Sequence, residues 1–348
     1  MKYAPVIIPT LCRFEHFQRC IESLKSNGWA SCTDVFIGLD YPPLEKYRPG
    51  WEKIKLYLSS SDFSAFASFT VLEQKKNIGA SANSRILREH ILSLGFDRWI
   101  YAEDDLEFSP NFIEYIDKCL DFYEDDPDVV GVTGYSYPID WSVSEGATCF
   151  KQKFNASTWG TGYWKKKTEP IRDYLSNCGL KKALPNVLKY KLYEDMIDTA
   201  KIEYFNEAFS IVHYLRINLM RVHSDLALRA YLAVEDKYYI TPVISKTRNY
   251  GFDGSGANCK DTSESGKDPS KYRIDGNAYF SLCPDETHDY QVNRDKMNSR
   301  ETRTKKEMRR TNALINMADL FGIWSSKLFL LILVPIDLMK IAIHKYKG

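Results

Sequence analysis

The sequence predicts an α/β fold with a parallel, doubly wound sheet and helices on both of its faces. Two observations predict it. Short apolar runs rich in β-branched residues alternate with segments of helical periodicity along the first half of the chain, and the best-defined run ends in acidic residues. With 348 residues and 44% hydrophobic content, the chain is long enough to bury a large core in one big domain or two moderate ones.

The first strand and helix form a β-α unit. Residues 4–9 are a short β-branched run that ends in proline, and helical spacing of apolar residues begins at Glu15. Asn27 and Gly28 end this helix. Its inward face is expected to contain Phe17, Cys20, Ile21 and Leu24.

The same pattern repeats along the chain. A second strand is expected over 34–40, a third over 69–74 and a later one over 129–134. A helix that Gly95 ends follows the third strand, and its apolar side contains Leu87, Ile91 and Leu94. Parallel pairing of such strands places their carboxyl ends at one edge of the sheet, where ligands bind.

The segment WIYAEDDLEFSP, residues 99–110, runs from an apolar strand directly into acidic residues. The strand is apolar enough to be central in the sheet. Ser109 and Pro110 then provide an N-cap and a first-turn residue for another helix. The acidic residues at the carboxyl end of the strand are Glu103, Asp104 and Asp105.

Three adjacent carboxylates repel one another unless a positive charge lies among them. Two interpretations are open. In one, the residues form a solvated acidic turn whose charge favours the amino end of the following helix. In the other, they hold a hard divalent cation, Mg²⁺ or Mn²⁺, together with substrate phosphates. The position at a strand end favours the cation.

Four segments together resemble a known enzyme family. They are PVIIPTLCRFEHFQRCIESL, VFIGLD, NIGASANSRIL and WIYAEDDLEFSPNFIEYI. They look like inverting GT-A glycosyltransferases, in particular the N-acetylglucosaminyltransferase I family, whose metal motif is also Glu-Asp-Asp followed by Leu, and bacterial polysaccharide glycosyltransferases. The resemblance covers residues 1–255. It implies a GT-A fold, which is a Rossmann-like mixed sheet flanked by helices, and a nucleotide-sugar donor.

The resemblance also implies roles for residues of the first half. Arg13, just after the first strand, contacts the nucleotide, and Asp40, at the end of the second, accepts hydrogen bonds from the base edge. Asn77 and Gly79 lie along the nucleoside, where glycine lets the backbone approach closely. A surface charge is the alternative for Arg13 and Asp40, and a plain turn is the alternative for the other pair.

In the acidic segment, the resemblance implies that Asp105 binds the metal directly and that Glu103 and Asp104 contact sugar or ribose hydroxyls. The cation, Mn²⁺ or Mg²⁺, bridges the two donor phosphates. It stabilises the charge that develops on the nucleoside diphosphate as the sugar leaves.

An inverting transfer also needs one general base that takes the proton from the acceptor hydroxyl. The register of the resemblance places this base at Asp225, before a helix-like run and a strand that ends at Ser245. In the alternative, Ser224 and Asp225 merely cap that helix. Glu235 and Asp236 are the second choice for the base.

Two loops of the second half are candidates for substrate contact. Aromatic residues interleaved with glycines over 155–167 predict a wall on which a sugar stacks, with Trp159, Gly160 and Gly162 in the sugar pocket. An aromatic corner of the core with turn glycines is the alternative. The glycine-rich segment 248–259 is expected to be a lid over the nucleotide, and an idle loop is the alternative.

The carboxyl-terminal part of the chain predicts contact with a membrane. Residues 291–310 include eight basic residues against three acidic ones, and apolar stretches follow them. The uninterrupted apolar run 328–336 is far shorter than the ~20 residues that span a bilayer. We expect a helical membrane-associated tail that lies in the interface of an anionic membrane surface. A dimerisation helix is the alternative.

Three parts are therefore expected: a nucleotide-sugar-binding half over 1–135, an acceptor-binding and catalytic half over 136–275, and a membrane-attachment tail over 276–348. The eight cysteines have no CxxC or zinc spacing and indicate reduced thiols in a cytosolic compartment. No signal peptide is expected, which predicts a peripheral protein on the cytoplasmic face of the inner (plasma) membrane. The net charge of +1 gives no bias toward nucleic acid.

The sequence thus predicts a metal-dependent inverting glycosyltransferase that moves a sugar from a UDP-sugar to a lipid-linked glycan acceptor in bacterial surface polysaccharide synthesis. One alternative is a catalytically silent glycan-binding or scaffold protein with the same fold. Another is a sugar-phosphate nucleotidyltransferase. That enzyme requires a glycine-rich, basic phosphate loop after the first strand, which PTLCRFEHF lacks.

Overall fold

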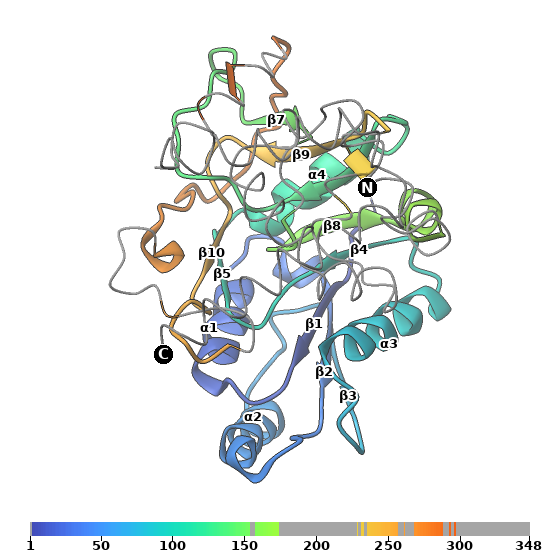
Figure 1. The fold of residues 1–348 in the computed structure, drawn as a ribbon, viewed down its shortest axis with the longest axis vertical. Helices are drawn as coiled ribbons and strands as arrows, with labels where there is room; N and C mark the ends of the chain where they lie inside the picture. Colours follow the sequence, from blue (N-terminus) through green and yellow to red (C-terminus); the bar gives the residue numbers. More distant parts are fainter. Residues whose placement is uncertain are drawn as a thin grey trace, which may run out of the picture.

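The computed structural model describes residues 2–153, 157–173, 235–256 and 268–287, together with residues 228, 231, 232, 261, 292, 293 and 296. Within this part of the chain, the strands form one sheet of eight strands and a second sheet of two. Figure 1 shows these elements in colour along the sequence.

The first half of the large sheet is parallel. Its strands follow the order β3-β2-β1-β4, and β1 lies between β2 and β4. They are β1 (Val6–Thr10), β2 (Asp34–Leu39), β3 (Ser68–Glu73) and β4 (Arg98–Tyr101). The expected strands are confirmed within a few residues at their ends. Their carboxyl ends lie at one edge of the sheet.

The second half of the sheet is mixed, in agreement with the mixed sheet that the resemblance implies, and the parallel arrangement is confined to the first half. Its strands are β6 (Val129–Thr133), β7 (Cys149–Gln152), β8 (Thr161–Trp164) and β9 (Tyr238–Pro242). β8 lies antiparallel between β4 and β6, and β9 runs parallel to β6 and antiparallel to β7. The two-stranded sheet pairs β5 (Leu106–Phe108) with β10 (Thr247–Asn249). A mixed α/β sheet is the architecture that a GT-A fold implies.

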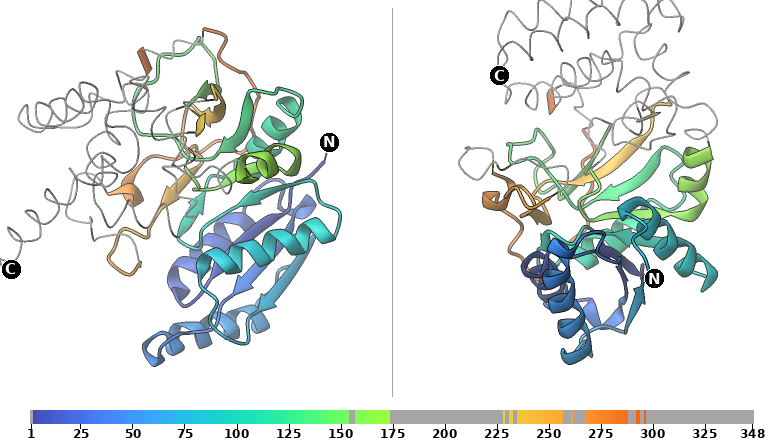
Figure 2. Two further views of the ribbon diagram at one scale, coloured as in Figure 1. Left: turned by 45° about the vertical axis from the view of Figure 1, so that its right-hand side comes forward. Right: turned by 60° about the horizontal axis from the view of Figure 1, so that its bottom comes forward.

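Helices cover both faces of the sheet (Figure 2). They are α1 (Phe14–Lys25), α2 (Arg48–Ser60), α3 (Ala80–Ser93) and α4 (Phe112–Phe122), with 3₁₀ turns at Ala30–Cys32, Glu45–Tyr47 and Pro269–Lys271. Val6 and Ile8 of β1 share a core with α1, α2 and α4, whereas Ile7 packs with α3 on the opposite face. Alternation of side chains along β1 explains this division.

Local patterns predicted some helix boundaries and missed others. The helix expected from Glu15 is confirmed as α1, and its four predicted inward residues are buried. The helix after the acidic segment begins later than expected, at Phe112 with Asn111 as N-cap, because the Ser109 hydroxyl donates to the Asn111 side chain instead of capping. Leu94 is 56% exposed because α3 ends before it. The sequence pattern did not predict α2.

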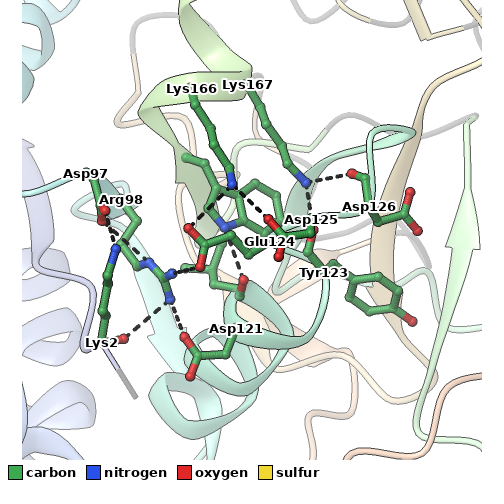
Figure 3. A network of polar contacts seen from close by, with 12 residues as sticks. Lys2, Asp97, Arg98, Asp121, Tyr123, Glu124, Asp125, Asp126, Lys166 and Lys167 are labelled. Carbon is green, nitrogen blue, oxygen red and sulfur yellow. Dashed lines mark hydrogen bonds and ion pairs between the residues drawn. The ribbon is translucent and has the colours of Figure 1, made fainter.

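A buried arginine holds the amino end of β4 against α4 (Figure 3). Arg98 is 1% exposed and donates to Asp121 at 2.5 Å and to Glu124 at 2.8 Å. Nearby, Lys167 donates to three backbone carbonyls that follow α4, among them that of Tyr123 at 2.6 Å. These contacts fix β4 at the end remote from the acidic residues.

Residues 268–287 cross α4 and reach β7, and we call them the carboxyl-terminal strap. Lys246 is buried and pairs with Asp275 of the strap. Phe280 donates its backbone N–H to Glu114 of α4 at 2.8 Å. The first residues of the expected membrane tail are therefore folded onto the core.

Within the described residues, no helix has the length and apolar character needed to cross a membrane. Residues 297–348, which contain the apolar stretches of the expected tail, lie outside the described part of the chain. Membrane attachment through the tail therefore remains a prediction.

Asp117 is a fully buried carboxyl group of α4. Its Oδ1 accepts the Ala4 N–H at 3.0 Å, and its Oδ2 has no hydrogen-bond partner among the described residues. Burial raises the pKa of Asp117 from 3.8 to about 7, against the opposing effects of the Ala4 hydrogen bond and the Arg98 charge. The folded state therefore favours the protonated carboxyl group.

Replacing Asp117 with asparagine should remove a pH dependence of stability. Between pH 3.8 and about 7 the folded wild type binds more protons than the unfolded chain, so its free energy of unfolding falls as the pH rises. In urea denaturation, the variant should therefore gain roughly 1 to 3 kcal/mol on the wild type when the pH is raised from 5 to 8. An identical pH dependence of the two proteins would contradict this account of Asp117.

Candidate active site

The carboxyl ends of three neighbouring strands bring the predicted polar residues together. β1 ends at Thr10, Asp40 follows β2, and the acidic segment 103–105 follows β4. The Asp40 N–H donates to the Thr10 carbonyl at 2.9 Å, and the Thr10 hydroxyl donates to Asp104 at 2.8 Å. The strand order therefore places Asp40, the candidate contact for the nucleotide base, and the acidic segment at the same edge of the sheet.

Arg13 supplies the positive charge that the acidic segment needs. Its guanidinium pairs with Asp104 through Nη2 and with Asp105 through Nη1, the second at 2.8 Å. Only 8% of each carboxylate side chain is exposed. Burial lowers the pKa of Arg13, but the two carboxylates outweigh that effect and raise it above its ordinary value. The predicted contact of Arg13 with a nucleotide remains a prediction.

Asp105 is a buried carboxylate whose ionised form is disfavoured. Burial raises its pKa, Arg13 opposes the rise, and the neighbouring charge of Asp104 adds to it. Removal from water is thus only partly offset by the arginine. A further cation beside Asp105 would lower that pKa and stabilise the carboxylate.

Residues 249–251 lie directly on Asp105, and we call residues 249–255 the covering segment. Asn249 Nδ2 is 3.4 Å from Asp105 Oδ1, and the Tyr250 N–H donates to the Asp105 carbonyl at 2.9 Å. At Gly251 a Cβ atom would lie only 2.1 Å from Asp105 Oδ2. A glycine is therefore required where the covering segment meets the carboxylate.

Asp40 organises the loop that follows β3. Its carboxylate is 3% exposed and accepts backbone N–H groups of Ile78 at 3.0 Å and Gly79 at 2.8 Å, and the side-chain amide of Asn77 at 3.1 Å. Gly79 has a φ of +81°, a conformation that favours glycine, and α3 begins directly after it. Asp40 thereby holds the two predicted nucleoside contacts beside β2. Its own predicted contact with a base edge remains a prediction.

An aromatic group borders the acidic segment. Thr158 donates its hydroxyl to Glu103 at 3.1 Å, and the adjacent Trp159 ring lies 4.6 Å from the Tyr135 ring and 5.7 Å from the Phe252 ring. Trp159 is half-buried. This arrangement suits the sugar wall that the sequence predicts, and the role of Trp159 stays a prediction.

Gly160 and Gly162 have a packing role. Gly160 has a φ of +69°, and a Cβ there would lie 2.9 Å from the Phe112 side chain. A Cβ at Gly162 in β8 would lie 2.6 Å from the Ile116 side chain. Both glycines are buried beneath α4, which favours the alternative of a packed aromatic corner over a place in the sugar pocket.

The candidate bases fall in two places. Asp225 lies outside the described residues, so its role remains a prediction. Glu235 and Asp236 precede β9, which points in the same direction as β4 and β6, so they lie at the edge of the sheet opposite to Asp105. Asp236 pairs there with Lys153 at 2.9 Å. The second choice for the base was therefore wrong.

The carboxylate oxygens of the acidic segment are the type of ligand that Mg²⁺ and Mn²⁺ prefer. Asp104 and Asp105 supply hard carboxylate oxygens, and one or two carboxylates completed by substrate phosphates are the usual protein ligands of Mg²⁺. Among the described residues, no group of three or more His, Cys, Asp or Glu side chains is placed to hold a metal. Because Arg13 pairs with both carboxylates, a cation has to share them with its guanidinium.

The sequence analysis did not single out Thr10, and it included Asn249 and Gly251 only as part of the expected lid over 248–259. Thr10 contacts Asp104 from the last position of β1, where the strand-end rule offered a signal. Asn249 and Gly251 reach Asp105 from a distant segment, and Asn249 is 144 residues away from Asp105 in the sequence. Pairing of β10 with β5 brings them there, and no local pattern signals that pairing.

Comparisons with known proteins give similarities of fold only. No family model matches the chain, and no curated protein matches it. Among solved structures, S. aureus TarS 1-349 in complex with UDP-GlcNAc is similar with 12% identity and a TM-score of 0.34, over 49% of this chain and 48% of that one. The WbbM bifunctional glycosyltransferase gives 10% identity, a TM-score of 0.29 and coverage of 50% and 33%.

The glycosyltransferase GlyE of Streptococcus pneumoniae TIGR4 is similar over more of this chain, 69%, and over 45% of its own, with 12% identity and a TM-score of 0.28. The chain thus spans less than half the length of each of these three proteins. At such identities and TM-scores the similarities carry no functional argument, so the proposal below rests on the site.

Replacing Gly251 with alanine should destabilise the protein, because the new methyl group has no room beside Asp105. We expect a loss of roughly 1 to 3 kcal/mol in the free energy of unfolding, measured by chemical denaturation. Gly276→Ala is the matched control, since a Cβ at Gly276 meets nothing within 4 Å. Equal stability of the Gly251 and Gly276 variants would show that the covering segment is not packed on Asp105.

Proposed function

We propose that the protein is a metal-dependent inverting glycosyltransferase that moves a sugar from a nucleotide donor to a glycan acceptor. The observation that carries the proposal is the meeting of two buried carboxylates, Asp104 and Asp105, with the loop held by Asp40 at the carboxyl ends of adjacent parallel strands. Ligands bind at this edge of open α/β sheets. A carboxylate completed by donor phosphates, here that of Asp105, is also a usual means of holding Mg²⁺.

A UDP-sugar is the proposed donor. The uracil ring offers an N–H group to a carboxylate acceptor, and Asp40 is the carboxylate at the end of β2. Nothing lies within 4 Å of a Cβ built at Gly79, so the loop leaves space beside that residue. Arg13 bears a planar guanidinium that suits the oxygens of a diphosphate.

Transfer breaks the bond between the anomeric carbon and a diphosphate oxygen, and negative charge develops on the leaving diphosphate. When bound, Mn²⁺ or Mg²⁺ acts as a Lewis acid that stabilises this charge. Asp105 is the proposed direct ligand, with Glu103 and Asp104 as contacts to hydroxyl groups. Arg13 offers further positive charge to the same leaving group.

Asp225 is the proposed general base. As the acceptor oxygen attacks the anomeric carbon, one carboxylate must accept its proton. Glu235 and Asp236 lie at the far edge of the sheet, which leaves Asp225 as the candidate from the sequence resemblance.

The acceptor is proposed to be a lipid-linked glycan, with the enzyme held peripherally at the cytoplasmic face of the membrane by its basic and apolar tail. The support for this is the sequence of residues 291–348 alone. The pathway that follows from it is synthesis of a bacterial surface polysaccharide.

UDP should stabilise the wild type only when Mn²⁺ is present, since a ligand that binds the native state raises its stability. At UDP concentrations near 100 times the dissociation constant, the rise in Tm should be on the order of 5 °C. Asp105→Ala should abolish the effect of Mn²⁺, whereas Asp125→Ala, which removes an exposed acid, should keep it. Thermal-shift titrations with UDP, GDP, CMP and dTDP measure both effects.

Two results of these titrations would contradict the proposal. If Asp105→Ala still binds UDP more tightly with Mn²⁺ than without it, the metal site lies elsewhere. If no nucleotide shifts the Tm of the wild type under any metal condition, the acidic segment is structural and a glycan-binding scaffold becomes the better account.

Asp225→Asn should leave UDP and metal binding intact and reduce turnover by about 10² to 10⁴. The reason is that an amide cannot accept the acceptor proton. The assay is transfer from the UDP-sugar on which the wild type is active, with Glu235→Gln as the control that should remain active. Near-normal turnover of Asp225→Asn would remove this residue from the mechanism.

A further inference from the structure

Three basic residues, Arg13, His16 and Arg19, lie at intervals of three from the N-cap of α1 onward, and the covering segment lies against each of them. Arg13 Nη1 would be 3.1 Å from a Cβ at Gly251, and the Arg19 guanidinium lies 3.9 Å from the centre of the Tyr250 ring. His16 lies between them in sequence. Residues spaced by three share one face of a helix, so the covering segment lies along a basic face that begins at the candidate active site.

His16 contacts the covering segment through a hydrogen bond to a carboxylate. Its Nε2 is 3.0 Å from Asp253 Oδ2 and 3.3 Å from the Ser255 hydroxyl. An ionised carboxylate only accepts hydrogen bonds, so Nε2 carries the hydrogen. The His16 side chain is 13% exposed, and its Nδ1 is buried with no hydrogen-bond partner among the described residues. His16 is therefore a donor held beside the site.

Asp253 is presented to His16 by a short turn. Its Oδ1 accepts the backbone N–H of Ser255 at 2.9 Å and the Ser255 hydroxyl at 2.6 Å. Burial opposes ionisation, but these hydrogen bonds and the nearby histidine hold the pKa of Asp253 below its ordinary value. With 44% of its side chain exposed, Asp253 is a solvent-accessible anion on a basic face.

We propose that His16 is a phosphate-binding residue and that Asp253 occupies the position of a phosphate on it, so that a nucleoside diphosphate and Asp253 compete for the same imidazole N–H. The inference rests on the proposed function, because it assigns a second contact to the diphosphate of the same donor. Phosphate oxygens accept charge-assisted hydrogen bonds as carboxylate oxygens do. Arg13 is the N-cap of α1 and His16 lies in its first turn, so the two linked phosphates of one donor are proposed to contact both residues.

The exchange has a consequence for the rest of the covering segment. Phe252 lies against Trp159, and Gly251 lies against Asp105. Phe252 directly precedes Asp253 in the chain, and Gly251 precedes Phe252. Release of Asp253 from His16 therefore loosens the segment over the carboxylate and beside the aromatic group, where the donor sugar is proposed to lie.

Calorimetric titration of the full chain with UDP and with uridine tests the inference. Asp253→Asn replaces a charged competitor by a neutral one, so it should bind UDP roughly 3- to 30-fold more tightly than the wild type. His16→Gln should bind UDP roughly 10-fold more weakly. Uridine has no phosphate, so its affinity should be the same for all three proteins.

Asp62→Asn is the matched control, because Asp62 accepts the N–H and hydroxyl of Ser64 in the same kind of turn on an exposed loop. It should leave UDP affinity unchanged. If Asp253→Asn binds UDP equally or more weakly while the wild type binds it, Asp253 does not compete with phosphate and the inference is overturned. The same holds if the two site variants change uridine affinity as much as UDP affinity.

The failure of the proposed function gives a different result. In that case neither the wild type nor any variant binds UDP, with or without Mn²⁺, and the inference falls together with the function. UDP binding that is indifferent to both Asp253→Asn and His16→Gln overturns the inference alone.

Discussion

The ion pairs of Arg13 with Asp104 and Asp105 are the interaction on which the rest of the site depends. Two buried carboxylates side by side would cost several kcal/mol without a partner of opposite charge. Arg13 reaches them from the turn between β1 and α1, so that turn must keep its position. α2 holds it there: a Cβ on Gly50 would lie 2.0 Å from the Cys12 carbonyl oxygen, and only glycine permits so close a contact. An otherwise unremarkable helix thus determines where the arginine lies.

The site consists of a firmly held strand and, over it, the covering segment. The strand is β4, which is fixed at its amino end by the buried Arg98 and at its carboxyl end by β1. The covering segment is held by the hydrogen bond of the Tyr250 N–H to the Asp105 carbonyl at 2.9 Å, by that of the Tyr250 hydroxyl to Glu107 at 2.8 Å, and by the pair of Asp253 with His16. Exposed pairs of this kind contribute little to stability. In the exchange proposed above, a phosphate displaces Asp253 from His16 and leaves the strands beneath undisturbed.

Local periodicity predicted the parts of the fold that local forces determine. The inward face of α1, the positions of the first strands along the chain and the acidic residues at the end of β4 follow from patterns within single segments. The reversal of β8, the packing of Gly162 under α4 and the partners of Asp40 depend on contacts between distant segments, which single-segment patterns do not encode. The contact of His16 with Asp253 spans 237 residues. Asp225 and the apolar tail lie outside the described residues and remain sequence predictions.

The carboxyl-terminal strap determines how far the gene can be shortened. The buried ammonium of Lys246 takes its countercharge from Asp275, and the Phe280 ring lies 5.0 Å from that of Tyr115 in the core. Asp285 accepts the backbone N–H of Ser144 at 2.9 Å, so the strap is fastened again beyond α4. A fragment cut where the sequence places the start of the tail, at residue 276, would expose core aromatic groups and invite aggregation. Asn293 is also buried and accepts the Ser142 N–H at 2.6 Å, so a shortened chain should end after this residue rather than before it.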